Sequence, residues 1–439
     1  MVKRSADAAD HLDDAARAQG LKEDAPRLWH RYRRLPKNVV VIGLISLLND
    51  ASSEIIYPLL PLFLTLTLGA SPKIIGLIEG TAESLSSLLK LFAGYFSDRR
   101  GRRKGWVVGG YALANFIRPL LGFATNWLQV LAIRLTDRVG KGVRTAPRDA
   151  MIADTVSVKE RGLAFGFHRA MDHAGAVIGP LVGFLLIYWI ASDRNSPSAS
   201  DYRKIFLLAS VPALCAVAVA VFGLKETVTK RGADALARPR LSLRGFDANF
   251  KRFLFLVALF TLSNSSDAFL LLRAKQAGVL EVNIPLLWAA LHVTKVLSSL
   301  VGGDLSDRLG RRTLIASGWL LYAAVYLDFA FISTPAAAWT VFLIYGVYFG
   351  LAEGAEKALV ADLVRANQRG TAYGLYNLAF GITVLPASLM MGFLWDWFSP
   401  QAAFIVSACV GATAALLLLL TVSAKGQLYE TDTKRVSKG

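Results

Sequence analysis

Long apolar segments recur through this 439-residue chain and constrain its fold more than any other feature. Each is about 20 residues long, the length that an α-helix needs to cross a hydrocarbon core of about 30 Å. Hydrophobic residues make up 54% of the chain and charged residues 18%, so too little polar surface remains to cover a soluble globule. The sequence therefore predicts an all-α membrane protein with twelve transmembrane helices. We place them at residues 38–68, 74–97, 106–125, 127–146, 163–190, 204–223, 252–275, 283–303, 313–333, 337–360, 371–396 and 401–423.

Basic residues gather in every second connection between these spans. The basic connections are residues 99–104, 138–161, 225–252 and 308–312, whereas the alternate connections carry few Lys or Arg apart from the one between the fifth and sixth spans. Cytoplasmic loops of membrane proteins are enriched in Lys and Arg, so both termini are predicted to face the cytoplasm at the cell (inner) membrane. The same pattern accounts for the formal charge of +17, and we expect no nucleic-acid partner.

The chain is built from two related halves. "GYFSDRRGRR" from Gly94 recurs as "GDLSDRLGRR" from Gly303, and "AMIADTVSVKERGLAFG" from Ala150 recurs as "ALVADLVRANQRGTAYG" from Ala358. The two offsets are nearly equal, which indicates duplicated six-helix units. We predict a basic cytoplasmic segment at 1–37, a bundle at 38–224, a cytoplasmic linker at 225–251, a second bundle at 252–423 and a cytoplasmic tail at 424–439.

The first of these repeats resembles the loop signature of the major facilitator superfamily. The first copy matches it at Gly94, Asp98, Arg99, Gly101, Arg102, Arg103 and Lys104, and the second copy keeps Gly303, Asp307, Arg308, Gly310, Arg311 and Arg312. With the twelve spans, the resemblance covers nearly the whole chain. It implies two pseudo-symmetric six-helix bundles and a gating role for the loop, in which the Asp98 carboxylate contacts the start of the eleventh span near Thr371.

The fifth span is similar to the antiporter signature of the same superfamily. The matching residues are Gly166, Gly175, Gly179, Pro180 and Gly183, while Phe184 replaces the final glycine. Small residues at this spacing allow two helix backbones to approach closely, so plain packing is an alternative interpretation. The resemblance implies proton-coupled export.

Four ionisable residues open the fifth span: His168, Arg169, Asp172 and His173. Their spacing allows the pairs His168–Asp172, Arg169–His173 and Arg169–Asp172 on one helix. Ionisable groups within a membrane are costly and mark functional pathways, which favours a proton or cation relay. A neutralised Arg169–Asp172 pair that only fixes helix packing is the alternative.

Other spans carry further candidates for these roles. The proton-coupling candidates in the first half also include Asp50, Glu54, Glu79, Glu83, Arg118 and Arg134. The superfamily links an arginine at the place of Arg134 to proton coupling, although the surrounding segment is more charged here than is usual. The substrate-pocket candidates in the second half are Asn264, Asp267, Tyr345, Glu353 and Asn377.

These observations predict a secondary active transporter that exports a small organic solute or drug by proton-coupled alternating access. Its partners would be a small-molecule substrate, protons and the lipid bilayer, and we expect a monomer without a cofactor or resident metal. An exporter of a divalent metal cation or metal chelate such as a siderophore is an alternative, since carboxylate and imidazole suit divalent ions. A transport-like receptor is an alternative from another class. An enzyme is not expected, because the H-E-x-x-H, G-x-S-x-G and P-loop motifs are missing.

Overall fold

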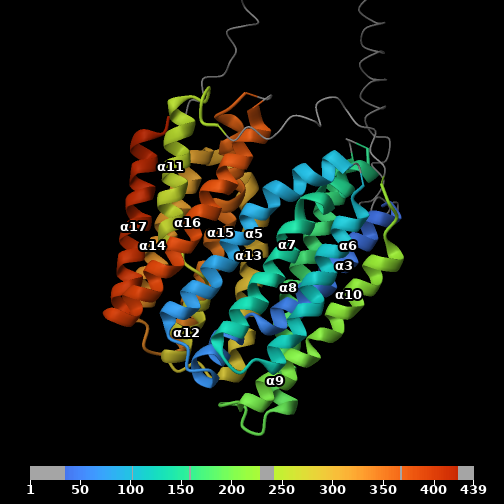
Figure 1. The fold of residues 1–439 in the computed structure, drawn as a ribbon. Helices are drawn as coiled ribbons and strands as arrows, with labels where there is room; N and C mark the ends of the chain where they lie inside the picture. The colour runs from blue at the N-terminus through green and yellow to red at the C-terminus, as the bar shows by residue number, and fades with distance from the viewer. Residues whose placement is uncertain (1–34, 101, 158–159, 228–241, 366–367, 424–439) are drawn as a thin grey trace, which may run out of the picture.

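The computed structural model describes residues 35–100, 102–157, 160–227, 242–365 and 368–423. Within these ranges the chain is helical and contains no strand. Most of the helices run side by side along one direction, and both ends of the described chain lie at the same end of the molecule (Figure 1). We call this the terminal end and the opposite one the far end.

The first half contains six helical stretches that traverse the molecule, some of them interrupted. They are α3 (Lys37–Ile56) with α4 (Leu60–Leu62) and η1 (Phe63–Thr67), α5 (Pro72–Arg100), α6 (Lys104–Ile117) with η2 (Arg118–Phe123), α7 (Trp127–Thr155), α8 (Arg161–Ile190), and α9 (Ala199–Leu208) with α10 (Ser210–Gly223).

The second half repeats this arrangement. Its stretches are α11 (Ala248–Ser263) with α12 (Ala268–Gln276), η5 (Glu281–Asn283) with α13 (Ile284–Leu309), α14 (Arg311–Phe331), α15 (Pro335–Asp362), α16 (Arg369–Trp397) and α17 (Pro400–Thr421). The predicted fold class, twelve helices in two six-helix bundles, is therefore confirmed. The exact domain boundaries stay a prediction.

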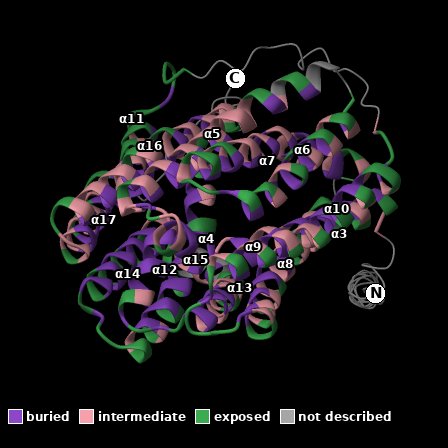
Figure 2. Ribbon diagram, turned by 60° about the horizontal axis from the view of Figure 1, so that its bottom comes forward, coloured by how far each residue is buried: buried purple, intermediate pink, exposed green. Residues whose placement is uncertain are grey.

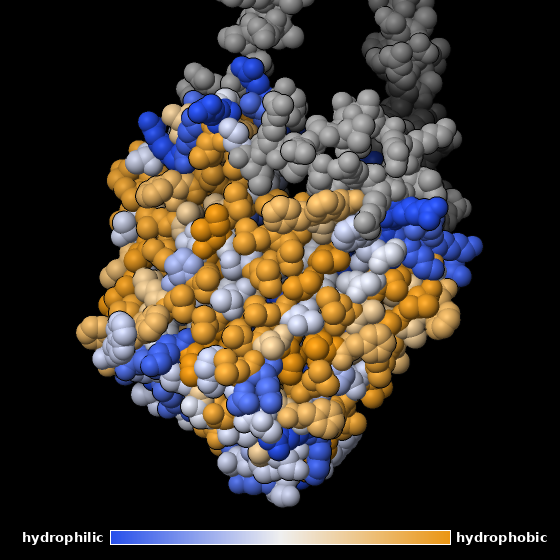
Figure 3. All heavy atoms as spheres, in the orientation of Figure 1, coloured by the Kyte–Doolittle hydropathy of each residue, from blue (hydrophilic) through white to orange (hydrophobic). Residues whose placement is uncertain are grey.

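Nine of the described helical stretches are long and apolar enough to cross a membrane by length and composition alone. The other three are α5, α6 with η2, and α7, of which α5 carries Glu79 and Glu83 and α7 carries Arg134, Asp137 and Arg138. Apolar residues still cover the middle of the molecular surface, and hydrophilic residues gather toward its two ends (Figure 3). Charge inside the bundle, rather than a shorter helix, lowers the hydropathy of α5 and α7.

Helix α7 is longer than the sequence analysis predicted. We expected the fourth span to end at residue 146 and a basic connection to follow, but the helix continues through Pro147 to Thr155. Its basic residues have partners that keep them in the helix: the Arg144 guanidinium lies 4.2 Å from the Tyr111 ring centroid, and Arg148 pairs with Asp149. Part of the predicted basic connection is therefore a helix end.

Side chains cap several helices where the chain turns at the far end. Ser198 and Asp201 form a reciprocal capping box at the start of α9, and Asn126 accepts a hydrogen bond from the Gln129 backbone N–H at the start of α7. Thr334 caps α15 in the same way. Such caps satisfy backbone N–H groups that have no partner within the helix, so these turns are sharply defined.

The first stretch of each half is broken at a corresponding place. In the first half the α-helix stops at Ile56, and Tyr57 and Pro58 lead into α4. In the second half α11 stops at Ser263, and α12 begins at Ala268. Discontinuous helices inside a membrane are tolerated where their backbone is buried in protein or lines a cavity. Such breaks in corresponding positions of the two halves mark the place of a binding site.

The two repeated sequence motifs meet in space within each half. The guanidinium of Arg103, from the first copy of the loop signature, lies 3.2 Å from the carboxylate of Asp154, which belongs to the second motif. In the second half Arg311, which corresponds to Arg102 in the aligned repeats, forms an ion pair with Asp362, the counterpart of Asp154. Each half therefore joins an arginine of the loop signature to the aspartate of the second motif, although from neighbouring positions of the signature, and this contact fastens helix ends together at the terminal end.

Helices α5 and α16 join the two halves along the part of their length nearer the far end. Small residues allow the contact: a Cβ added at Gly80 would lie 3.0 Å from that of Ser388, and the Ser84 hydroxyl donates to the Gly381 carbonyl at 2.5 Å. Helices α8 and α13 form the second junction, where Gly183 faces Pro285. Buried residues concentrate where helices face one another (Figure 2). The halves are thus closed together at the far end.

We expect a cysteine pair at Gly80 and Ser388 to cross-link across this junction. Disulfides need Cβ atoms about 3.5–4.5 Å apart, which a small helix shift provides here. The variant would lack Cys215 and Cys409, both exposed in the structure. The measurement is the mobility shift after brief oxidation in membranes, following cleavage of the linker between the halves.

The matched control pairs Phe92 with Tyr373. These residues lie eight positions further along each helix from Ser84 and Gly381, toward the terminal end, and Phe92 is exposed. This pair should cross-link more slowly. Faster cross-linking of the control pair would show that the halves are closed at the terminal end instead.

Candidate functional site

A cavity of about 390 Å³ lies between the two halves. All five substrate-pocket candidates from the sequence, Asn264, Asp267, Tyr345, Glu353 and Asn377, line it. The first half contributes residues of α5 and α7 together with Tyr57 at the break after α3. The second half contributes residues of α11, α15 and α16. A cavity shared by two halves can change its access when the halves move relative to each other.

The break between α11 and α12 forms part of the cavity wall. Its residues Asn264, Ser265, Ser266 and Asp267 all line the cavity, so polar side chains and freed backbone groups face the same space. The sequence analysis named Asn264 and Asp267 but missed the two serines. A local signal could have identified them. The polar residues "SNSSD" interrupt an apolar run at the place that corresponds to the Tyr57–Pro58 break of the first half.

A buried ion-pair network supports the first-half side of the cavity. Arg134 binds Glu79 with two hydrogen bonds of 3.0 and 2.7 Å, and its guanidinium lies 3.9 Å from Asp137. Arg118 donates to Asp137 at 2.8 Å and also to Ser52. Bidentate pairs of this kind fix side-chain geometry, and in a low-dielectric interior each charge needs its partner. The network ties α3, α5, η2 and α7 together.

Glu83 faces the cavity one turn beyond Glu79. Its carboxylate lies 3.9 Å from both Arg138 and Lys141 of α7, and Lys90 is within electrostatic range. Glu79 and Glu83 therefore share a face of α5, as predicted from their spacing, but bind different cations.

Glu54 connects the two halves on the side of the cavity toward the far end. It accepts a hydrogen bond of 2.8 Å from the Trp288 indole N–H of α13, and His292 lies 3.9 Å away. Asp50, one turn earlier on α3, instead accepts a hydrogen bond from the side-chain amide of its neighbour Asn49. The sequence analysis missed Trp288, because no local pattern indicates a partner so distant in the chain.

The antiporter-like glycines place α8 directly against α3. Added Cβ atoms at Gly175 and Gly179 would lie 2.6 Å from the carbonyl oxygens of Leu47 and Ala51, so no larger side chain fits without movement. Gly183 continues this contact one turn further on, whereas Gly166 faces open space and Pro180 is buried. The motif brings the acidic face of α3, with Asp50 and Glu54, close to α8.

Two of the four ionisable residues that open α8 form the core of a polar cluster in the first half. The His168 Nε2 atom lies 2.9 Å from the Ser46 hydroxyl and 3.5 Å from Asp172 Oδ1, and Ser46 bonds the Tyr111 hydroxyl. Asp172 Oδ1 is buried and has no hydrogen-bond partner among the described residues. Asp50 lies within electrostatic range of Asp172, so two carboxyl groups share this region.

The Arg169–Asp172 pair of the packing alternative is not among the ion pairs of the described residues. Arg169 is exposed, although it lies within electrostatic range of Asp172 and of Glu353 in the second half. His173 is half-buried, within electrostatic range of Lys295 and Glu353 of the second half. Of the four residues, His168 and Asp172 are therefore brought together and Arg169 is not.

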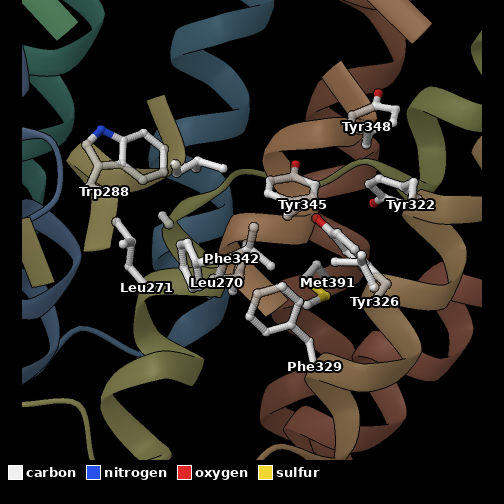
Figure 4. Close-up of a cluster of buried hydrophobic side chains, with 14 of the residues drawn as sticks. Leu270, Leu271, Trp288, Tyr322, Tyr326, Phe329, Phe342, Tyr345, Tyr348 and Met391 are labelled. Atoms are coloured by element: carbon white, nitrogen blue, oxygen red, sulfur yellow. The ribbon is translucent and has the colours of Figure 1, made fainter. Parts of the chain in front are cut away.

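The second-half side of the cavity is rich in aromatic rings. Tyr345 and Tyr348 stack with centroids 5.8 Å apart, and Tyr322 and Tyr326 lie beside them (Figure 4). The Tyr345 hydroxyl donates to Asp267 at 2.8 Å. Tyr111, by contrast, packs within the first half, where its hydroxyl bonds Ser46.

Glu356 is a second acidic residue on this side. Its carboxylate accepts hydrogen bonds from the Trp319 indole at 2.8 Å and the Tyr376 hydroxyl at 2.5 Å, and it is 8% exposed. Glu353, by contrast, pairs with Lys357 at 2.8 Å, and both side chains are about half exposed. Asp267 and Glu356 thus receive hydrogen bonds only from neutral donors among the described residues.

A buried polar contact crosses between the halves at the far end. Tyr202 of α9 donates to Glu281 of η5 at 2.5 Å, and Lys275 of α12 lies 2.7 Å from the same carboxylate. Both Tyr202 and Glu281 are buried. We call this group the far-end latch. The sequence analysis missed it, because its members lie outside the motifs and in separate connections.

The metal-binding alternative finds no site in the described parts of the chain. No group of three or more His, Cys, Asp or Glu side chains there could hold a metal ion. Carboxylate and imidazole groups that could serve as ligands have other partners: Glu79 binds Arg134, Glu54 binds Trp288 and His168 binds Ser46.

The gating prediction falls largely outside the described side chains. The side chains of Asp98, Arg99, Asp307 and Arg308, and the residue Gly101, lie outside the part that the structure describes. Gly303 belongs to α13, and Gly94 packs near Ala146. Arg102 is exposed, Arg312 donates to the Val422 carbonyl, and Gly310 has a φ of 84° at the turn into α14.

Known proteins share both the sequence and the fold of this chain. The sequence model of the Major Facilitator Superfamily matches residues 42–387 and 287–438. An uncharacterised MFS-type transporter of Methanocaldococcus jannaschii is 34% identical over 396 residues, covering 88% of this chain and 95% of the relative. A multidrug resistance protein, MdtG, of Escherichia fergusonii is 26% identical over 393 residues, covering 85% and 91%.

A solved structure shows the same fold at low sequence identity. The nucleoside transporter NupG superposes with a TM-score of 0.74 at 12% identity, covering 88% of this chain and all of the other. The family match, the relatives and the fold agree with the loop signature, the twelve helical stretches and the shared cavity. The chain therefore belongs to the Major Facilitator Superfamily and is a membrane transporter of that family.

Proposed function

We propose that this protein is a proton-coupled exporter of a small organic solute or drug, working by alternating access. The observation that carries the proposal is the cavity between the halves, sealed at the far end by the α5–α16 junction and the far-end latch. At the terminal end, the cavity residues Glu353 and Lys357 are about half exposed, so solvent reaches the cavity from that side. This arrangement suits a state that loads solute from the terminal end.

The terminal end faces the cytoplasm of the cell (inner) membrane in this proposal, and the protein acts as a monomer. The basic connections that flank the described helices lie at that end, and they support this orientation. Loading from the cytoplasm and release at the far end constitute export. A relative named as a multidrug resistance protein supports the same direction.

Proton coupling is assigned to the polar cluster of the first half. Asp172 is largely buried, its Oδ1 atom lacks a hydrogen-bond donor within the described part of the chain, and the His168 Nε2 atom lies 3.5 Å from it. A carboxyl group in this setting can exist either protonated or charged, depending on small movements of its neighbours. The close α3–α8 contact carries any such movement to Glu54 and the junction between the halves.

A metal or chelate exporter and a transport-like receptor remain the alternatives. A thermal-shift screen of the purified protein against drugs, sugars, siderophores and divalent metals would identify the solute class. Counterflow of the identified solute in proteoliposomes then separates the alternatives, because a receptor binds without exchanging solute across the membrane.

We expect Asp172→Asn to abolish pH-gradient-driven transport of the screened solute while sparing solute binding. Asparagine mimics the protonated carboxyl but cannot release a proton. The measurement is proton-driven flux in proteoliposomes, paired with the melting temperature. Asp328→Asn, an exposed carboxylate of α14, is the matched control and should transport normally.

Full flux in Asp172→Asn with normal stability would refute the coupling role. A lowered melting temperature, with a flux that falls in proportion to the loss of stability, would favour a packing role for Asp172.

We expect Tyr202→Phe to weaken closure of the far end. A hydrogen bond to a charged carboxylate contributes about 1.5–3 kcal/mol, and this one joins the halves only when the far end is closed. A cysteine at Ser266 in the cavity should therefore be labelled at least about tenfold faster by a membrane-impermeant maleimide added at the far side.

The exposed Tyr188, which stacks with Arg194 at the same end, provides the control substitution Tyr188→Phe. An unchanged labelling rate in Tyr202→Phe, equal to that of the control, would show that the latch does not hold the far end closed.

A further inference from the structure

We propose that the solute is a lipophilic organic cation, and that Asp267 and Glu356 are the carboxylates that bind it. This inference rests on the proposed function, since it assigns the chemistry of the same cavity. It follows from which charges of the cavity wall are already neutralised and which are not.

The cavity wall carries more carboxylates than basic groups. Its carboxylates are Glu79, Glu83, Asp267, Glu353 and Glu356, and its basic residues are Lys90, Arg138 and Lys357. Three of the acids have cationic partners: Glu79 binds Arg134, Glu83 lies near Arg138 and Lys141, and Glu353 binds Lys357. Two of the basic residues of the cavity wall, Arg138 and Lys357, are therefore already used in these ion pairs. The acids without an ion pair among the described residues are Asp267 and Glu356.

Both remaining carboxylates are fixed in place by neutral donors. Tyr345 holds Asp267, while Trp319 and Tyr376 hold Glu356. Hydrogen bonds orient a carboxylate but do not cancel its charge, and an uncompensated charge in the interior of a membrane protein is costly. A proton or a bound cation is therefore needed at each site.

Aromatic rings beside these carboxylates select a lipophilic cation over a small hydrated one. Tyr348, Phe349 and Phe260 line the same cavity, and their faces attract cations. The wall already shows this mode of binding: the Lys295 ammonium lies 3.5 Å from the Phe349 ring centroid. An organic cation with apolar substituents would bury those substituents against the rings and place its charge near the two carboxylates.

The same geometry makes proton and solute compete. One proton leaves a carboxyl group when a cation takes its place there, so solute bound from one side exchanges for protons bound from the other. The groups facing Asp267 are Tyr345, Tyr348, Tyr326, Tyr57 and Lys295. Those facing Glu356 are Trp319, Tyr376, Tyr348, Glu353 and Lys357. Cation binding should therefore strengthen as the pH rises.

The test uses two probes of nearly equal shape and opposite charge, tetraphenylphosphonium and tetraphenylborate. Saturable binding of each is measured by equilibrium dialysis against the full-length protein in phosphatidylcholine nanodiscs, without any transport step. We expect the wild-type protein to bind the phosphonium and not the borate. Acidification should weaken phosphonium binding, and binding should release protons into a weakly buffered solution.

Asp267→Asn and Glu356→Gln should each weaken phosphonium binding by at least about tenfold, the effect typical of losing one partner of a buried charge pair. Asp267→Asn keeps an oxygen that accepts the Tyr345 hydrogen bond. Glu356→Gln keeps an oxygen for the Trp319 indole, while its amide NH2 can donate to the Tyr376 hydroxyl, so the fold should persist. Asp328→Asn is the control, because this exposed carboxylate of α14 does not line the cavity. Its affinity should stay within about twofold of wild type.

Preferred binding of the borate, or phosphonium binding that is independent of pH and of both carboxylates, would overturn this inference. The wild-type pH dependence decides the question if a variant fails to fold. Counterflow of any other solute would leave the transporter proposal standing after such a result, whereas failure of counterflow with every binding solute would overturn the proposed function itself.

Discussion

The requirement to neutralise charge inside a bilayer is the constraint on which this structure depends. On the first-half side of the cavity it is met internally: Arg134 holds Glu79 in a bidentate pair, and Arg118 holds Asp137, so helices of low hydropathy can sit among apolar neighbours. In the second half it is met only in part, because Asp267 and Glu356 are held by tyrosine and tryptophan donors. The two walls of the cavity therefore differ. The carboxylates of the first-half wall are paired with cations, whereas two carboxylates of the second-half wall need a proton or a bound cation.

Close backbone approach determines where that cavity closes. The glycines of α8 bring its backbone against α3, and Gly80 and Gly381 bring α5 against α16 toward the far end. Small residues are effective here because helix association in membranes depends on van der Waals packing rather than on the hydrophobic effect. The same two helices contribute Glu79, Lys90, Asn377 and Ser388 to the cavity wall. The junction and the cavity therefore share one helix pair.

Much of the fold was predictable from the sequence, because span length, basic loops and an internal repeat are local or periodic signals. The pocket residues were also predictable, since Asn264 and Asp267 interrupt an apolar run. Side-chain partners were predictable only in part. The spacing rule offered Asp172 two partners on its own helix, His168 and Arg169, and did not choose between them, whereas the structure brings His168 within 3.5 Å. Contacts such as Glu54–Trp288 and Tyr202–Glu281 join distant parts of the chain, and no periodicity in one sequence encodes them.

The most direct test of proton-coupled alternating access measures both ends of the molecule at once. Spin labels would be placed at Asp193 and Ser333, exposed at the far end, and at Gly105 and Gly370, where an added side chain meets open space at the terminal end. Pulsed electron–electron double resonance then gives the distance between the two labels at each end, at neutral and at acidic pH. The account predicts that the two distances change in opposite directions and that Asp172→Asn removes the response. Distances that stay fixed, or that change in the same direction, would contradict it.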